Sequence, residues 1–131
     1  MPGTPGNIAQ DYSDLAGHVG DVIADTSIPK TPAQLTQLGN ASNALLNYSN
    51  QLADAGAWAA LNAAQSDFDQ IKAATSTANA AAAALKTQAS KLNSILTIVG
   101  DALTLGAKIV SGDLPGALNA ASTLATDATS A

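Results

Sequence analysis

Residues 92–110 read LNSILTIVGDALTLGAKIV, and on a helix this stretch separates into a polar side and an apolar side. The apolar side holds a heptad seam and, beside it, a second stripe formed by Ile95, Ile98, Ala102, Leu105 and Ile109. Together the two stripes cover nearly half of the helix, whereas an ordinary surface helix buries an arc of ~100°. One neighbouring helix cannot cover so wide an apolar arc.

Two interpretations of this wide apolar arc are open. In the first, a central helix packs against two or three others and buries the whole arc inside a bundle. In the second, part of the arc contacts an outside partner: a second copy, a lipid, or a membrane after the bundle opens. The candidate interface residues are Trp58, Ile95, Ile98, Leu105 and Ile109.

The same stretch is too short to cross a bilayer as it stands. The apolar run from Ile95 to Val110 is sixteen residues long and carries Asp101 near its middle. A bilayer needs ~20 predominantly apolar residues, and a charge at its centre is costly. We therefore do not expect a transmembrane span in the folded form.

A single heptad phase runs through residues 57–110, with neither proline nor glycine between Gly56 and Gly100. Taken as one helix, this run would be ~80 Å long, far beyond the helices of ordinary globular domains. Residues 75–79, TSTAN, are the weakest helix formers in the run. The sequence therefore predicts a long central helical hairpin that reverses near Ser76.

The N-terminal part of the chain predicts a short tail followed by a helix. Residues 1–6 hold two prolines and two glycines, so we expect a flexible tail there. From Asn7, a plausible N-cap, apolar residues recur at helical spacing and stop before Ile28. Residues 7–131 are then expected to form one helical bundle domain.

Two further helix boundaries carry strong local signals. Thr31-Pro32-Ala33-Gln34 combines an N-cap threonine, an early proline and the glutamine of a capping box. Ser111-Gly112-Asp113-Leu114-Pro115 ends one helix and caps the next, which begins at Leu114. The predicted fold is all-α, an antiparallel four-helix bundle with the long central hairpin.

The composition predicts a thin core. Hydrophobic residues make up 47% of the 131, but 30 of them are alanine and only 27 are leucine, isoleucine, valine or phenylalanine. Alanine helices approach closely, yet each buried alanine removes much less apolar area than a leucine. We expect modest stability, or stability gained from a partner.

The charge balance excludes one class of partner. The chain has five lysines, no arginine, ten acidic residues and a net charge of −5. Nucleic-acid binding requires clustered cations, so a nucleic-acid partner is not expected. The polar surface relies on serine, threonine, asparagine and glutamine, which favours a secreted or cell-surface location. No signal sequence is visible at residues 1–6, and removal of one beforehand is the alternative.

The residues that carry most enzyme chemistry are scarce. There is no cysteine, and His18 is the only histidine, so neither a metal site nor a cofactor is expected. A Ser-His-Asp arrangement can be drawn around His18 only because serine is abundant. No glycine-rich phosphate loop occurs. We therefore expect no catalytic residues, and His18 is either a surface residue or a pH-sensitive charge.

Three classes of function remain, none of them enzymatic. The first is a secreted helical protein that binds an apolar ligand or a membrane through the wide helix face, with toxin-like or pore-forming action included. The second is a self-assembling structural or filament subunit, a homo-oligomer. The third is a small module that binds a protein partner. We favour the first, because the wide apolar arc exceeds what a small bundle requires.

Overall fold

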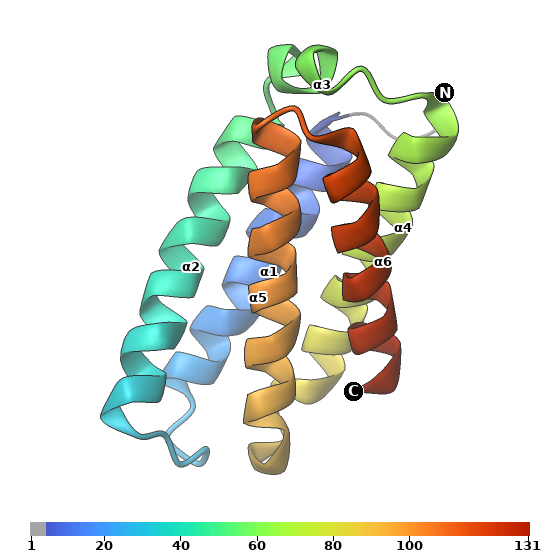
Figure 1. Ribbon diagram of the computed structural model, residues 1–131. Coiled ribbons are helices and arrows are strands. Elements are labelled where there is room, and N and C mark those ends of the chain that lie inside the picture. Colours follow the sequence, from blue (N-terminus) through green and yellow to red (C-terminus); the bar gives the residue numbers. More distant parts are fainter. Residues whose placement is uncertain (1–4) are drawn as a thin grey trace.

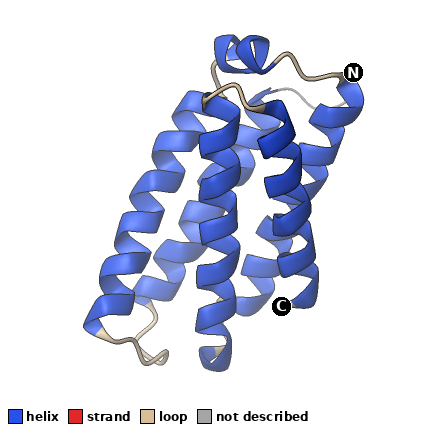
Figure 2. Ribbon diagram, viewed as in Figure 1, coloured by secondary structure: helices blue, strands red, loops and turns tan. Residues whose placement is uncertain are grey.

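The computed structural model describes residues 5–131, except the side chains of residues 5–7, 55, 57 and 60, and it is all-helical over that range (Figure 2). The all-α prediction is confirmed. In chain order, the elements are α1 (Pro5–Ala24), α2 (Pro32–Leu52), α3 (Ala55–Leu61), α4 (Gln65–Leu85), the 3-10 turn η1 (Ala89–Lys91), α5 (Leu92–Val110) and α6 (Leu114–Ser130). The predicted arrangement of four helices is wrong, because five of these helices are long.

The five long helices form a closed ring around one hydrophobic core. Helix α1 packs against α2 and α4, α6 packs against α4 and α5, and α2 completes the ring by packing against α5. Short α3 lies across one end of the ring, above α2 and α5 (Figure 1). In this arrangement α5 contacts helices on both sides, as the first interpretation of its wide apolar arc requires.

The predicted reversal near Ser76 does not occur. Helix α4 continues through this region because its hydroxyl groups find partners without breaking the helix. The Thr77 hydroxyl donates to the Ala73 carbonyl at 2.9 Å, and the Thr75 hydroxyl donates to the Asp11 carboxylate of α1 at 2.8 Å. Hydroxyl residues destabilise a helix interior mainly by competing for such bonds, and here the bonds are satisfied inside the fold.

The long heptad run is instead divided at two other places. Asn62 adopts a left-handed conformation with φ 54° and ends α3, a conformation that asparagine tolerates better than most residues. The second break spans residues 86–91, where the chain reverses through η1 and only then enters α5. The predicted long central hairpin is thus three helices, α3, α4 and α5.

The ends of the helices follow the local capping signals with one exception. The Thr31 hydroxyl accepts from the Gln34 amide at 3.1 Å, and the Gln34 side chain accepts from the Thr31 amide at 2.8 Å, so the capping box is confirmed. Asp113 caps α6 as predicted. Helix α1 begins at Pro5, so the predicted N-cap at Asn7 is wrong. Residues 1–4 of the predicted tail lie outside the described residues.

Tyr12 of α1 and Tyr48 of α2 both pack on α5, at the small residues Ala102 and Gly106. We call this arrangement the tyrosine junction. The buried Tyr12 hydroxyl donates a hydrogen bond to the Ala102 carbonyl oxygen. The Tyr48 ring covers Gly106, and the two rings meet edge to face with centroids 6.5 Å apart. Burial raises the pKa of Tyr12, so its phenol remains a donor. The junction therefore connects α1 and α2 to α5 at two small residues of α5, Ala102 and Gly106.

Two glycines of α5 give a matched test of this packing. A Cβ at Gly106 would lie 2.9 Å from Cγ of Tyr48, whereas a Cβ at Gly100 would meet nothing within 4 Å. Gly106→Ala should therefore lower the free energy of unfolding by ~1–3 kcal/mol through overpacking. Gly100→Ala should raise it by ~0.5–1 kcal/mol, because alanine is the better helix former. Urea denaturation of both variants measures the difference, and equal effects would contradict the close packing at Tyr48.

Candidate functional site

The five predicted interface residues lie in the core. Ile95 is 1% exposed, and Ile98, Leu105 and Ile109 are fully buried between α5 and its neighbours. Trp58 is 8% exposed. In the folded bundle these residues are therefore not available for contacts at the surface. They pack the helices together.

Trp58 anchors α3 to the end of the bundle. Its indole Nε1 donates to the Leu52 carbonyl at 2.7 Å, where α2 ends. Its ring meets the Phe68 ring of α4 in an edge-to-face contact with centroids 5.1 Å apart. This is the packing anchor that a lone tryptophan often provides, with its polar atom satisfied by a backbone carbonyl.

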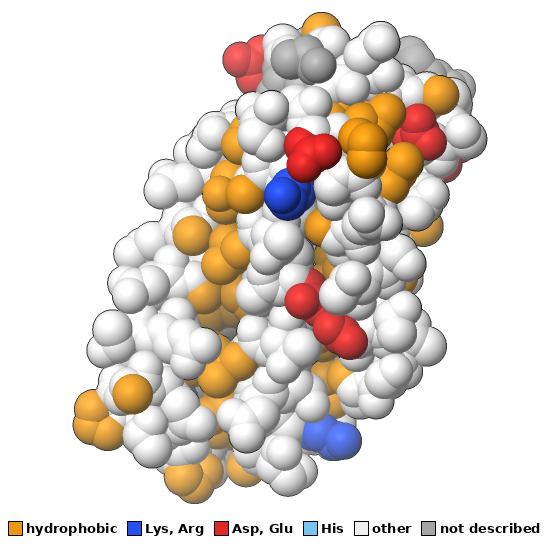
Figure 3. All heavy atoms as spheres, in the orientation of Figure 1, with side chains coloured by type: hydrophobic (Ala, Val, Ile, Leu, Met, Phe, Trp, Pro, Cys, Tyr) orange, Lys and Arg blue, Asp and Glu red, His pale blue; other side chains and the backbone are white. Residues whose placement is uncertain are grey.

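One edge of the wide apolar arc remains accessible at the surface. A groove of about 310 Å³ opens between α2 and α5. It is lined by Gln37, Asn40, Ala41, Ala44, Leu96, Val99, Gly100 and Leu103. Figure 3 shows hydrophobic side chains along the hollow between these two helices. We take this α2–α5 groove as the candidate functional site.

Small residues and helix divergence create the groove. Helix α2 lies close to α5 at the tyrosine junction and diverges from it toward the opposite end of the bundle (Figure 1). Below the junction, the facing positions Ala41, Ala44 and Gly100 are too small to fill the widening space. Leu96 and Leu103 are therefore left only partly buried, although both belong to the heptad seam.

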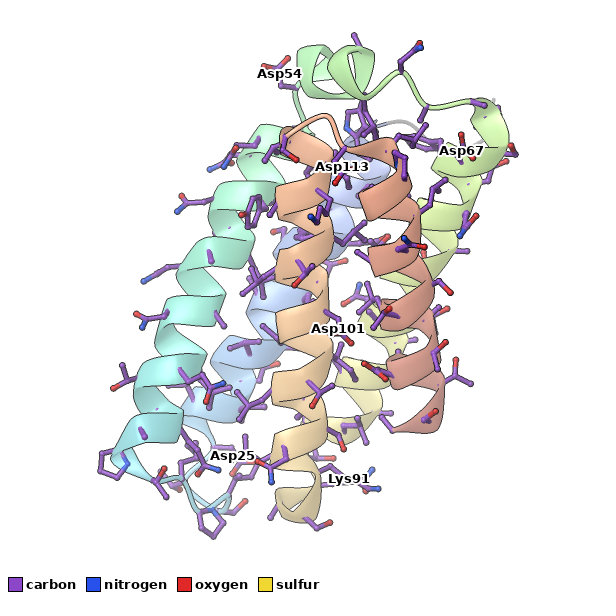
Figure 4. The ribbon with its side chains drawn as sticks, viewed as in Figure 1. Asp25, Asp54, Asp67, Lys91, Asp101 and Asp113 are labelled. Carbon is purple, nitrogen blue, oxygen red and sulfur yellow. The ribbon has the colours of Figure 1, made fainter. Side chains whose placement is uncertain are left out.

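The groove is uncharged. Its lining holds only aliphatic groups, a glycine and the side-chain amides of Gln37 and Asn40. The whole of α2 carries no charged residue, and the one carboxylate in the middle of α5, Asp101, points toward α6 (Figure 4). An uncharged site of this kind favours an uncharged apolar ligand whose polar group bonds to amides at the rim.

Charged groups gather on the other side of the molecule, between α1 and α4. Lys72 bonds to Asp11 and Lys86 bonds to Asp21, each at 2.7 Å. His18 belongs to the same surface, with its Nδ1 3.2 Å from the Lys86 ammonium, beside an open hollow of about 340 Å³. Partial burial, and then the neighbouring lysine, lower the pKa of His18, so its neutral form is favoured at neutral pH.

This arrangement of His18 does not match a hydrolase triad. In a triad, a carboxylate accepts from one imidazole nitrogen and a serine hydroxyl bonds to the other. Here an ammonium group occupies the Nδ1 side, and none of the described hydrogen bonds joins a serine to His18. The imidazole accepts from the lysine, so it is oriented by a cation and not by an acid.

Metal-ligating clusters and membrane-spanning helices are two further features to consider in residues 5–131. No group of three or more histidine, cysteine, aspartate or glutamate side chains within them is placed to hold a metal ion. By length and composition the segment Ala89–Val110 is apolar enough to cross a membrane, with a mean hydropathy of 1.3. Core helices pass the same test, and α5 has its wide arc in the core.

Comparison of the chain with protein-family models, with curated proteins and with solved structures gave no match. The geometry of the groove and the charges around it are therefore the features from which a function can be inferred.

The environment of His18 can be tested by replacing its cation. Lys86→Met removes the ammonium beside Nδ1 and leaves Asp21 and Asp14, whose charges raise the pKa of His18. The pKa should therefore rise toward the ordinary value of ~6.5. An NMR titration of the imidazole protons measures it, with Lys91→Met as a control on the opposite side of the turn. An unchanged midpoint would show that the lysine does not face the ring in solution.

Proposed function

We propose that the protein is a non-enzymatic binding protein that holds a small, uncharged, single-chain apolar molecule in the α2–α5 groove. The observation that supports this proposal is the wholly uncharged lining of the groove. Polar side chains are confined to the Gln37 and Asn40 amides, while alanine, valine, leucine and Gly100 form the rest. A volume of about 310 Å³ lies at the lower end of the range for ligand pockets, so the ligand is small.

The charge of the ligand follows from the charges of the chain. No cation lines the groove, and the net charge of the chain is −5. A carboxylate or phosphate head group would be repelled at long range and would find no counter-ion at the rim. A hydroxyl or amide head group can instead exchange hydrogen bonds with the two side-chain amides. A fatty alcohol has this chemistry.

The groove is a better supported site than the whole wide face of α5. Exposing Ile95, Ile98, Leu105 and Ile109 to a membrane would remove four core side chains, each stabilising by ~1.5–3 kcal/mol. Their sum is comparable to the entire stability of a typical domain, ~5–15 kcal/mol. Pore-forming or toxin-like action through this face would thus require the bundle to open first. Binding at the groove requires no such change, because Leu96 and Leu103 are already accessible.

A substitution that fills the groove tests the proposal. Gly100 lines the groove and a Cβ added there would meet nothing within 4 Å, so Gly100→Leu should direct a side chain into the space that the ligand would occupy. We expect binding of 1-decanol to weaken by about tenfold or more. Displacement of the uncharged dye Nile red measures the affinity. Gly17→Leu is the matched control, a glycine of α1 with equally open space on the opposite side.

Decanoate, with the same chain and an anionic head, should compete much less well than decanol. Equal displacement by both, or equal binding by the Gly100→Leu and Gly17→Leu variants, would contradict a groove selective for uncharged ligands. Light scattering of the same samples distinguishes the alternative of self-assembly. A mass that rises with concentration and falls in Gly100→Leu would assign the groove to a second copy of the chain.

A further inference from the structure

The seam between α5 and α6 contains a pair of facing carboxyl groups. Asp101 of α5 and Asp127 of α6 face each other across this seam, and two carboxyl groups can hydrogen-bond to each other only when one of them keeps its proton. Figure 3 shows two acidic side chains side by side in the middle of the viewed face, and Figure 4 shows Asp101 pointing from α5 toward α6. The Oδ2 atom of Asp101 is buried, and none of the described donor groups bonds to it.

This pair differs from the three carboxylates that form ion pairs, because no cation accompanies it. Asp11, Asp21 and Asp113 each bond to a lysine, respectively Lys72, Lys86 and Lys108. Between them, α5 and α6 carry three ionisable side chains: Asp101, Asp127 and Lys108. The lysine is at the far end of α5 and is already bonded to the cap of α6.

The neighbouring helices supply no counter-charge either. Helices α2 and α3 carry no charged side chain, and the hydroxyl of Tyr48 is the one titratable group of α2. On α4, Lys72 bonds to Asp11, while Asp67 and Asp69 bond to the start of that helix. On α1, Tyr12 bonds to the Ala102 carbonyl. The remaining ionisable groups of α1 are Asp14, His18 and Asp21, and they face α4.

The chemistry of two such carboxyls depends on one proton. With the proton, one carboxyl donates to the other and a hydrogen bond closes the seam. Without it, two like charges face each other in a partly dry contact and repel. Burial, and then the hydrogen bond and charge of Asp127, raise the pKa of Asp101 to about 7. Physiological pH therefore lies in the range where this proton is gained or lost.

We propose that Asp101 and Asp127 form a proton-dependent latch between α5 and α6, which closes in mildly acidic solution and loosens in mildly alkaline solution. When the latch loosens, the middle of α5 and the last turns of α6 separate. These last turns lead directly to the C-terminus of the chain (Figure 1). The latch is independent of the proposed ligand, since the groove lies on the other side of α5.

The direction of the stability change follows from the pKa. A carboxyl whose folded pKa is raised from 3.8 to about 7 holds a proton in the folded state that it lacks in the unfolded state. The resulting stabilisation is complete below pH ~4 and is lost as the pH rises through ~7. Other groups do not imitate this trend. The pKa values of Asp21 and Asp25 are lowered, so these two groups change the stability only below pH ~4. The pKa of His18 is also lowered, so this group makes the stability rise with pH below ~6.5, which is the opposite trend.

Urea denaturation across pH ~5 to ~8 in a His18→Gln background tests the latch. We expect the equilibrium constant for unfolding to rise by about tenfold or more over this range, less than the full shift in pKa would give because the pair is partly exposed. Asp101→Asn keeps a hydrogen-bond donor toward Asp127 but cannot titrate, so its stability should be flat and should exceed that of the parent at pH ~8. Asp127→Asn should flatten the curve as well. Asp69→Asn, an exposed aspartate of α4, should leave it unchanged.

Two direct measurements complete the test. The carbon-13 carboxyl resonance of Asp101 should titrate with a midpoint near pH ~7, and amides of the last turns of α6 should exchange faster at pH ~8 than their intrinsic rates predict, except in Asp101→Asn. A midpoint below pH ~5, or a pH slope that survives in Asp101→Asn, would overturn the proposal. So would calcium chloride restoring stability at pH ~8 in the parent alone, because the pair would then be a cation site.

Discussion

The close approach of small residues is the constraint on which this fold depends. A chain with 30 alanines gains little from each buried side chain, so its helices must approach closely to gain dispersion contacts. The tyrosine junction shows how this is achieved. Tyr12 and Tyr48 supply the large apolar surfaces that alanine lacks, and they rest on Ala102 and Gly106 of α5. The serine hydroxyl of Ser49 similarly donates to the Ala9 carbonyl across α1 and α2 at 2.7 Å.

The same constraint creates the groove. Small residues allow two helices to pack closely where a tyrosine fills the space between them. Where no tyrosine is present, the small residues leave a hollow. Helices α2 and α5 meet at the tyrosine junction and separate beyond it, and no charged residue enters the space between them. The Lys72–Asp11 and Lys86–Asp21 pairs lie instead between α1 and α4. The bundle therefore has a charged side held by ion pairs and an uncharged side that is accessible to apolar molecules.

The sequence predicted local features well and long-range ones poorly. The capping box at Thr31 and the cap at Asp113 depend on neighbouring residues, so the pattern was sufficient. The turn near Ser76 was wrong because its hydroxyls are satisfied partly by Asp11, more than sixty residues away. Residues 86–91 contain no glycine or proline, but they also contain no large apolar residue, and that gap could have located the reversal. The groove joins two distant helices, and the secreted location stays a prediction.

Trp58 has a consequence for how the protein is observed. It is the only tryptophan, and it lies where α3 covers one end of the bundle, hydrogen-bonded to the Leu52 carbonyl and in edge-to-face contact with Phe68. Its fluorescence is therefore a local reporter for the detachment of α3, a seven-residue helix that can open before the ring does. A change in Trp58 emission without a change in circular dichroism would indicate that α3 has detached while the five-helix ring remains folded.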